Sequence, residues 1–347
     1  MKGFMRGIVK EKPDNSAVYR EDIPIPQISA SEVLVKVKAA AICGTDLHIM
    51  HWSQYAEDRL KLPMVFGHEF AGDIVEIGGN VRDFKVGDRV AGETHIPCND
   101  CYQCKTNNRH ICENMKIIGI NVPGAFCEYI SVPQDCLFHI EDTISYITGA
   151  MLEPMGVAVH GVSAANVMDK NVLIYGCGPI GLMAVGAAKS LGAKRVFAGD
   201  VFDAKLDIAL KMRADKVINS KNKDLVNIIR EETAGIGCDV VIDYTGNKHA
   251  IKSGFDSLSK GGTYVMVGLP SSPVELDLAN DIIYKEATVI GVTGRRMYET
   301  WDECIDILND INFDITPVLG GTYNMKDFEG AFDALYNGAP GKMILIP

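Results

Sequence analysis

The feature that most constrains this chain is a glycine-rich turn between an apolar strand and a helix. The sequence GCGPIG at residues 176–181 follows the apolar run Asn171–Tyr175 and precedes a helical segment. In that setting a G-x-G-x-x-G motif is typical of dinucleotide binding. Gly176 permits the tight turn, Gly178 lets the backbone approach a pyrophosphate, and Gly181 lets the helix pack close to the strand. The helix N-terminus offers free N–H groups to the phosphates. The alternative is a structural turn without a ligand.

An acidic residue after the motif indicates which dinucleotide binds. Asp200 closes the next predicted strand, 19 residues after Gly181. A carboxylate at this place accepts hydrogen bonds from the ribose hydroxyls of NAD and repels the additional phosphate of NADP. Phe202 offers no compensating cation and Lys205 only a weak one. We therefore expect NAD as the cofactor.

Apolar strands and helices alternate through the middle of the chain. The strand candidates are Val172–Tyr175, Val196–Gly199, Lys216–Ile218, Val240–Asp243, Tyr264–Val267 and Thr288–Val292. Helices are expected between them, such as Ala204–Met212 and Lys223–Glu232. Near-continuous apolar strands that alternate with helices predict a parallel sheet covered on both faces. Six such strands fit a doubly wound (Rossmann) fold of the α/β class.

The first part of the chain has a different pattern, with short strands and turns. Val33–Val37, Gly72–Ile77 and Asp88–Ala91 are β-type runs bounded by Gly, Asn and Asp. This pattern predicts a mostly-β domain over residues 1–153.

The Glu153-Pro154 step predicts the boundary between the two domains. Proline disfavours α geometry in the residue before it and is well placed in the first turn of a helix. We expect Glu153 at the end of an extended segment, a helix from Pro154 to Ala165, and a nucleotide-binding domain over residues 154–293. Residues 294–347, with a helix at Tyr298–Leu308 and a strand at Lys342–Ile346, are expected to return to the first domain.

Composition excludes several classes of protein. The 347 residues carry 34 Lys and Arg against 45 Asp and Glu, a net charge of −11, which gives no attraction to nucleic acid or to an anionic membrane. The long uncharged stretch Val172–Ala188 is interrupted by glycines and a proline, so it does not resemble a membrane span. We expect a cytoplasmic enzyme that acts on a small molecule.

Four of the ten cysteines lie close together, between residues 95 and 115. Their spacing is Cys98-x2-Cys101-x2-Cys104-x7-Cys112. Four thiolates form a closed tetrahedral Zn²⁺ site, so this lobe is predicted to be structural. An iron–sulfur cluster is the alternative for thiolates at this spacing.

A second, mixed set of metal ligands precedes this lobe. Cys43 begins the sequence CGTDLH, and His68 and Glu69 follow about 25 residues later. A Cys, a His and a carboxylate leave one coordination position open, as a catalytic zinc site requires. The alternatives are a buried apolar thiol for Cys43 and a hydrogen-bonded core histidine for His68.

In combination these motifs resemble the zinc-dependent medium-chain alcohol dehydrogenases. The resemblance rests on CGTDLH at residues 43–48, GHEFAG at 67–72, GDRV at 87–90, the four-cysteine lobe and the glycine-rich turn, in this order. Within that family the chain is most similar to the threonine dehydrogenases. The closer match is carried by residues 92–95, 119–126 and 294–301.

The resemblance implies a GroES-like catalytic domain and a role for each matching residue. Cys43, His68 and Glu69 match the catalytic-zinc ligands, Glu153 matches a carboxylate near that metal, and Thr45 and His48 match a proton relay. The implied NAD contacts are Gly176, Gly178, Ile180, Gly181, Asp200, Lys205, Val267, Gly268, Leu269, Val292 and Thr293. Related enzymes are oligomers, and by analogy we expect a homotetramer that pairs through the sheet edge at residues 289–292.

The implied activity is oxidation of a secondary alcohol with hydride transfer to NAD, one catalytic and one structural zinc being bound per chain. The favoured reaction converts L-threonine to 2-amino-3-oxobutanoate, with His95 and Arg295 as candidates for the substrate carboxylate and Glu153 for its ammonium group. The alternatives are a sorbitol or 2,3-butanediol dehydrogenase and, from another class, a non-catalytic NAD-binding redox sensor. Two departures from the threonine enzymes are Lys205 in place of Arg and the apolar Val122.

Overall fold

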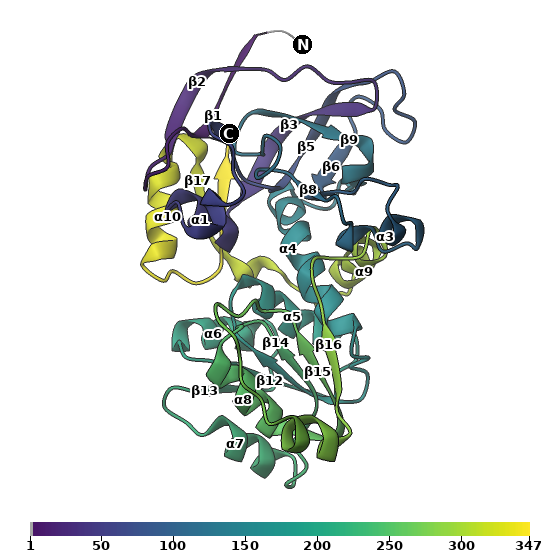
Figure 1. Ribbon diagram of the computed structural model, residues 1–347, viewed down its shortest axis with the longest axis vertical. Helices are drawn as coiled ribbons and strands as arrows, with labels where there is room; N and C mark the ends of the chain where they lie inside the picture. The colour runs from purple at the N-terminus through teal and green to yellow at the C-terminus, as the bar shows by residue number, and fades with distance from the viewer. Residues whose placement is uncertain (1–2) are drawn as a thin grey trace. The chain divides into compact units, whose positions relative to one another are not determined.

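The computed structural model describes residues 3–347, which form two compact units. The first unit contains the chain up to Glu153 together with Leu319–Pro347, and the second contains Pro154–Val318. Figure 1 shows the elements of both. Within the described residues no helix is long and apolar enough to cross a membrane.

The first unit is built mainly of strands. Its larger sheet has the order β10-β6-β5-β3-β18-β17, with β9 paired to β3. These strands are β3 (Glu32–Ala41), β5 (Glu69–Ile77), β6 (Arg89–Gly92), β9 (Tyr129–Pro133), β10 (Leu137–His139), β17 (Leu319–Asn324) and β18 (Lys342–Ile346). A second sheet, β2-β1-β4, contains β1 (Phe4–Lys10), β2 (Val18–Pro24) and β4 (Met64–Val65), and a hairpin pairs β7 (His95–Ile96) with β8 (Lys116–Ile117).

A mixed aliphatic and aromatic core holds these sheets together. Phe66, Phe70 and Phe126 are fully buried in it, beside alternate residues of β3 such as Val33 and Val35. The alternation is the period-two pattern of a strand, which places successive side chains on opposite faces. The helices of this unit are α1 (Gly44–Met50), α2 (Gln54–Glu57), α3 (Tyr102–Lys105) and α10 (Phe328–Tyr336), with short 3-10 turns at Arg109–Ile111, Gln134–Cys136 and Met325–Asp327.

The second unit contains the predicted doubly wound sheet. All six strands are parallel, in the order β13-β12-β11-β14-β15-β16. They are β11 (Asn171–Tyr175), β12 (Arg195–Asp200), β13 (Lys216–Asn219), β14 (Cys238–Asp243), β15 (Leu258–Met266) and β16 (Thr288–Gly291). The order reverses between β11 and β14, which is where ligands bind in such sheets. The α/β fold class is confirmed.

Helices pack against the parallel sheet. They are α5 (Pro179–Ser190), α6 (Asp203–Lys211), α7 (Leu225–Glu232) and α8 (Lys248–Ser257). A further helix of this unit, α9 (Glu299–Leu308), follows β16. Helix α5 contacts β11 and β12, and α8 contacts β14 and β15. The helices thereby cover the apolar strands that the sequence pattern predicts.

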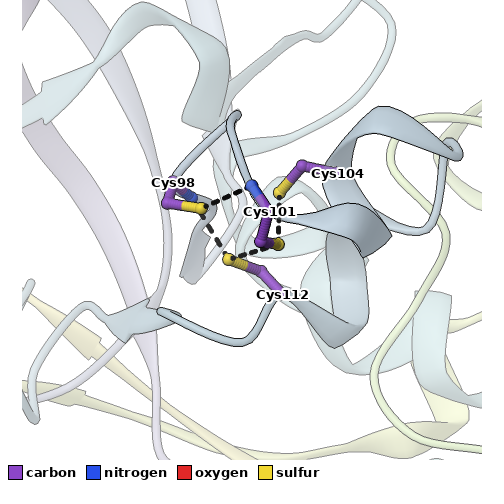
Figure 2. Close-up of side chains that lie close together, drawn as sticks. All are labelled: Cys98, Cys101, Cys104 and Cys112. Carbon is purple, nitrogen blue, oxygen red and sulfur yellow. Dashed lines mark hydrogen bonds between the residues drawn. The ribbon is translucent and has the colours of Figure 1, made fainter.

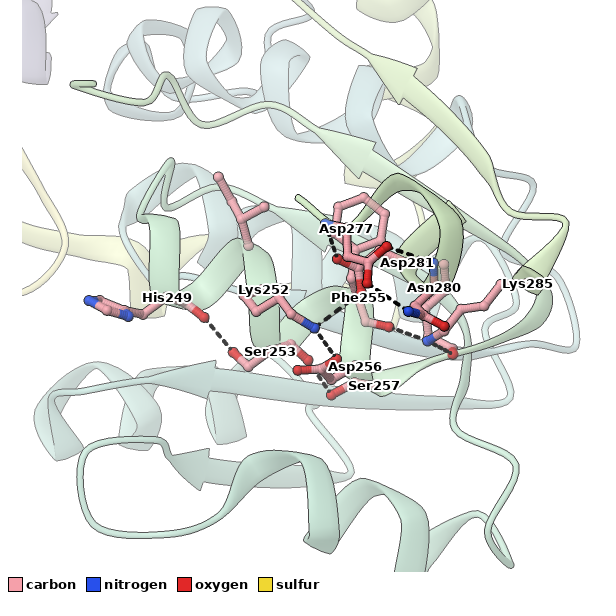
Figure 3. Close-up of polar contacts among 12 residues, drawn as sticks. His249, Lys252, Ser253, Phe255, Asp256, Ser257, Asp277, Asn280, Asp281 and Lys285 are labelled. Atoms are coloured by element: carbon pink, nitrogen blue, oxygen red, sulfur yellow. Dashed lines mark hydrogen bonds and ion pairs between the residues drawn. The ribbon is translucent and has the colours of Figure 1, made fainter. Parts of the chain in front are cut away.

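The segment between β15 and β16 is tied to α8 by charged side chains, as Figure 3 shows. This segment includes a π-helical turn at Leu278–Ile282 and a 3-10 turn at Ile283–Lys285. Lys285 Nζ donates to the main-chain oxygens of Phe255 and Leu258, the latter at 2.8 Å. Lys252 forms ion pairs with Asp256 and, at 3.1 Å, with the buried Asp281. These bonds anchor the connection that leads to the edge strand.

The structure corrects the expectation of a helix that begins at Pro154. Helix α4 runs from Tyr146 to Ser163, so Glu153 and Pro154 both lie inside it. A proline inside a helix removes one hydrogen bond and costs about 3 kcal/mol. The helix is buried along much of its length, with Leu152 and Met155 fully buried. Burial of these apolar side chains stabilises the helix and offsets the cost of a proline in its interior.

A second difference concerns residues 294–318, which we expected in the first domain. The structure places them in the second unit, and the chain returns to the first unit only at Leu319. Ser163 Oγ donates to Glu303 at 2.7 Å, and the main-chain oxygen of Gly294 lies 3.0 Å from His160 Nδ1. These contacts, which sequence spacing does not reveal, hold α9 and its flanking loops in the second unit.

Candidate active site and cofactor site

Three side chains in the first unit form a candidate metal centre. Cys43, His68 and Glu69 each offer one ligand atom, and these atoms lie within 4.8 Å of one another. Strand pairing explains the proximity, because Ala41 at the end of β3 is opposite Glu69 at the start of β5. Cys43 then lies just beyond β3 as the N-cap residue of α1. The structure therefore brings together the three residues that the sequence analysis singled out.

Charged neighbours surround this cluster. Asp46 is fully buried, and one of its carboxylate oxygens accepts a hydrogen bond from the Cys43 amide at 2.8 Å while the other lies 3.8 Å from His68 Nδ1. Although burial opposes a charged imidazole, the negative charges of Asp46 and Cys43 raise the pKa of His68 to about 10. Burial raises the pKa of Glu69 against the opposing effect of Lys342. The site thus brings acidic groups and the cation of Lys342 together in a water-poor environment.

The donor set fits a zinc ion. Glu69 Oε2 and His68 Nδ1 are buried and have no hydrogen-bond partner within the described part of the chain. Buried polar atoms are normally paired, so such atoms in one cluster call for an explanation. Thiolate, imidazole and carboxylate are the ligands that zinc accepts, and three protein ligands leave one position open.

Glu153 and the two residues of the implied relay belong to the first unit, Glu153 as its last residue before Leu319 and Thr45 and His48 on α1. Glu153 is buried in α4, close enough that its charge raises the pKa of both His68 and Glu69. Thr45 and His48 are separated by three positions on α1, so they share one face of the helix. Thr45 is half-buried and His48 is exposed, which suits transfer of a proton from the interior to solvent.

The four-cysteine lobe has the geometry of a closed metal site, as Figure 2 shows. The sulfurs of Cys98, Cys101, Cys104 and Cys112 lie within 4.8 Å of one another. Cys101 Sγ is 3.5 Å from Cys104 Sγ and 3.8 Å from Cys112 Sγ. Main-chain N–H groups donate to Cys98 Sγ and Cys112 Sγ, at 3.3 and 3.2 Å. Four sulfurs at this separation fill a tetrahedral shell, so a metal here would be structural.

The glycine-rich turn in the second unit has the expected local geometry. Gly176 has a φ of +94°, which lies in the left-handed region, and Gly178 is the N-cap residue of α5 with Pro179 at the first helical position. A Cβ on Gly181 would lie 1.8 Å from the main-chain oxygen of Gly176. The third glycine therefore allows the close packing of helix on strand that this motif requires.

Asp200 is held in place by main-chain amides on both sides. One carboxylate oxygen accepts from the Cys177 amide in the turn at 2.7 Å, and the other accepts from the amides of Val201 and Phe202 at 2.7 and 3.0 Å. The carboxylate is therefore fixed at the carboxyl end of β12, next to the turn. Lys205 Nζ lies 4.8 Å from the centre of the exposed Phe202 ring.

The remaining predicted cofactor residues follow the carboxyl ends of two other strands. Val267, Gly268 and Leu269 follow β15, and Val292 and Thr293 follow β16. The amides of Val267 and Gly268 both donate to the main-chain oxygen of Asp243, at 2.9 Å. These residues therefore lie at the same edge of the sheet as the glycine-rich turn. That they contact NAD stays a prediction.

The candidates for binding the substrate carboxylate have defined local settings. His95 is half-buried, with its Nδ1 3.0 Å from Glu93 Oε1. Arg295 is almost fully buried, and a Cβ on Gly156 would lie 2.7 Å from its side chain. Their roles in substrate binding stay predictions.

Sequence reasoning missed two charged residues beside the candidate metal centre, Asp46 and Lys342. For Asp46 a signal was available, since a residue three positions after an N-cap often bonds back to the N-cap amide. For Lys342 there was none, because its partner Glu69 is 273 residues away in the chain.

Comparison with known proteins agrees with this architecture. Residues 29–142 match the alcohol dehydrogenase GroES-like domain, and residues 179–310 match the zinc-binding dehydrogenase domain. The chain belongs to the zinc-binding alcohol dehydrogenase family.

The chain is also similar to individual dehydrogenases over its whole length. The chain is 42% identical to L-threonine 3-dehydrogenases of Caldanaerobacter subterraneus and Bacillus velezensis, with all of both chains covered. Among solved structures it resembles 2R,3R-butanediol dehydrogenase of Bacillus subtilis, with a TM-score of 0.88, 29% identity and 99% of each chain covered. It also resembles an alcohol dehydrogenase of Escherichia coli complexed with NADH, with a TM-score of 0.89, 29% identity and 99% coverage of each chain.

Proposed function

We propose that this protein oxidises L-threonine to 2-amino-3-oxobutanoate, using NAD and a zinc ion held by Cys43, His68 and Glu69. The observation that carries the proposal is the cluster of three ligand atoms from the half-buried Cys43 and the buried His68 and Glu69, which lie within 4.8 Å of one another. Identity of 42% to L-threonine 3-dehydrogenases over the whole chain supports threonine as the substrate. The carboxylate of Asp200, fixed beside the glycine-rich turn, supports NAD over NADP.

In this mechanism the residues of the chain bind, orient and move a proton. Bound zinc supplies a Lewis acid and bound NAD supplies a hydride acceptor. As the half-buried Thr45 hydroxyl accepts the proton of the substrate hydroxyl, it releases its own proton toward His48. The exposed His48 imidazole takes up that proton and passes it to solvent. Glu153 places a buried carboxylate near the metal centre, where it attracts the substrate ammonium group. The four-cysteine lobe holds a second, structural zinc ion.

A diol dehydrogenase is the second candidate, because the structure resembles the butanediol enzyme over 99% of each chain. Either reaction would use the same zinc and NAD sites of this chain, so the substrate has to be tested directly. Initial rates of NADH formation, measured by absorbance on L-threonine, sorbitol and 2,3-butanediol, separate them. We expect the highest kcat/KM on L-threonine, and a higher value on either polyol contradicts the substrate assignment.

The metal centre itself is tested by Cys43→Ser. We expect this variant to lose turnover and one bound zinc per chain while it still binds NADH, as followed by fluorescence. Unchanged turnover in a preparation with verified metal content contradicts the proposed site. Wild-type protein that binds NAD, lacks metal at Cys43 and turns over no alcohol indicates a non-catalytic NAD-binding sensor instead.

We further propose that the protein is a cytoplasmic homotetramer. Strand β16 is an edge of the parallel sheet, and Val289 on it is 40% exposed. Ile283 and Tyr284, just before that strand, are also exposed. An apolar strand edge of this kind is a template for pairing with another copy of the chain. Light scattering at micromolar concentration gives the mass, and any mass other than that of four chains contradicts the tetramer.

A further inference from the structure

One lysine of the first unit is buried beside the metal centre. Lys342, the first residue of β18, is only 3% exposed. Its Nζ donates to Glu69 Oε1 at 2.6 Å, and Glu69 is fully buried. Lysine and glutamate are rarely buried unless they pair. The pair therefore defines how Glu69 is held.

The strand register explains how two residues so distant in sequence meet. In the large sheet Ala41 of β3 is opposite both Glu69 of β5 and Ile344 of β18. Lys342 precedes Ile344 by two positions, so its side chain leaves the sheet on the same face. Ala41 thus separates Glu69 from Ile344, and the long side chain of Lys342 reaches past this end of β3 to the carboxylate.

Because of this contact, the two carboxylate oxygens of Glu69 have different surroundings. Oε1 is bound to the ammonium group, while Oε2 is buried and without a hydrogen-bond partner within residues 3–347. A carboxylate free on both oxygens can bind a metal through one or through both. Because the ammonium group of Lys342 competes with a metal for Oε1, Oε2 is the oxygen that remains free for the metal.

From this geometry we propose that Lys342 is a positioning residue that restricts Glu69 to single-oxygen ligation and so keeps one zinc position open for the substrate. The inference rests on the proposed function, since it takes Glu69 as a ligand of catalytic zinc. It adds a role for the C-terminal strand, which supplies no metal ligand itself. Lys342 also lies within electrostatic reach of Cys43 and Glu153, so its cation limits the build-up of negative charge around the metal.

A purely structural role is the competing explanation, because the same ion pair joins β18 to β5. The two explanations differ in what happens to the metal. A structural lysine, when removed, loosens the sheet and releases zinc together with activity. A positioning lysine, when removed, leaves the zinc bound but frees the second oxygen of Glu69 to occupy the open position.

The test compares Lys342→Met with Lys342→Arg, which keeps the positive charge. Lys10→Met is the matched control, because Lys10 is also fully buried in the first unit but donates to main-chain oxygens, among them Ser16 at 2.7 Å and Met50 at 2.9 Å. Zinc per chain, the visible spectrum of the protein with cobalt at the Cys43 site, thermal unfolding and kcat/KM are measured for each.

For Lys342→Met we expect full zinc content, a weaker cobalt absorption that reports a higher coordination number, and a kcat/KM about 10- to 100-fold lower. Lys342→Arg restores the cobalt spectrum, and Lys10→Met changes only thermal unfolding. An unchanged cobalt spectrum in Lys342→Met, or zinc lost in parallel with activity, overturns the proposal.

Two further variants keep the outcome decisive. If Lys342→Met does not fold, the double variant Lys342→Met/Glu69→Gln is used, because it removes both charges of the buried pair. The side-chain amide introduced by Glu69→Gln has a single oxygen, so it can bind the metal only through that atom. The cobalt spectrum of the double variant should then equal that of Glu69→Gln alone, and a different spectrum contradicts the proposal. If Cys43→Ser retains all metal and activity, the proposed function fails at the site itself, whatever Lys342 does.

Discussion

One substitution in the glycine-rich turn should weaken cofactor binding without lowering the stability of the protein. Gly178 has φ −68° and ψ 175°, which any residue adopts, and a Cβ built on it has no heavy atom within 4 Å. Gly178→Ala should therefore leave the free energy of unfolding unchanged or raise it by about 0.4–1 kcal/mol, because alanine has less freedom in the unfolded chain.

The same methyl group should interfere with NAD. The second glycine of this motif is required because the backbone approaches the pyrophosphate closely. Excess volume at a packed contact costs about 1–3 kcal/mol, which corresponds to a rise in Kd of roughly 5- to 150-fold. NADH fluorescence titration gives the Kd, and urea denaturation gives the free energy of unfolding.

Gly181→Ala is the matched control in the same turn. Its Cβ would lie 1.8 Å from the Gly176 oxygen, so the backbone must move by about 1.2 Å to reach the 3.0 Å that real contacts require. We expect this variant to lose about 1–3 kcal/mol of stability as well as NADH affinity. If Gly178→Ala binds NADH as the wild type does, or loses as much stability as Gly181→Ala, the reasoning about this turn is wrong.

Three other predictions concern separate parts of the molecule. Asp200→Asn removes the charge that repels a phosphate, so NAD should bind about tenfold more weakly or worse and the preference over NADP should shrink in titrations with both cofactors. Cys104→Ser breaks the four-sulfur site, so we expect one zinc fewer per chain and faster proteolysis of the 98–112 loop; an intact metal count contradicts a zinc role for the lobe. Burial lowers the pKa of His160, so the unfolded state takes up its proton first as pH falls and stability should decline below about pH 6.5. Urea denaturation of His160→Gln at several pH values should show a shallower decline, and an equal one excludes this residue as a cause.

Much of the fold is predictable from local sequence because its signals are local. The strand Val172–Tyr175 and the turn at 176–181 appear where the pattern places them, since apolar runs and glycines act over a few residues. Helix α4 is the counterexample. Proline at position 154 predicts a helix start, yet tertiary burial of Leu152 and Met155 carries the helix through it.

The candidate metal centre, too, is only partly predictable from local sequence. Cys43, His68 and Glu69 lie within sequence motifs, so their residue types alone indicate a metal. Lys342 meets Glu69 only because three strands align in register. A contact of this kind depends on the folded sheet and has no counterpart in residue spacing.

The position of β18 determines when each unit can be completed during synthesis. Residues 154–318 form one continuous segment, so the nucleotide-binding unit has all of its strands before the last part of the chain emerges. The metal-binding unit lacks β17 and β18 until then, and β18 lies between β3 and β17 in its sheet. Because domains generally fold as units, the segment translated first should remain without this internal strand of its sheet until translation reaches Ile346. A ribosome-bound chain that stops before β18 should therefore be able to fold the dinucleotide unit but should leave Glu69 without its lysine.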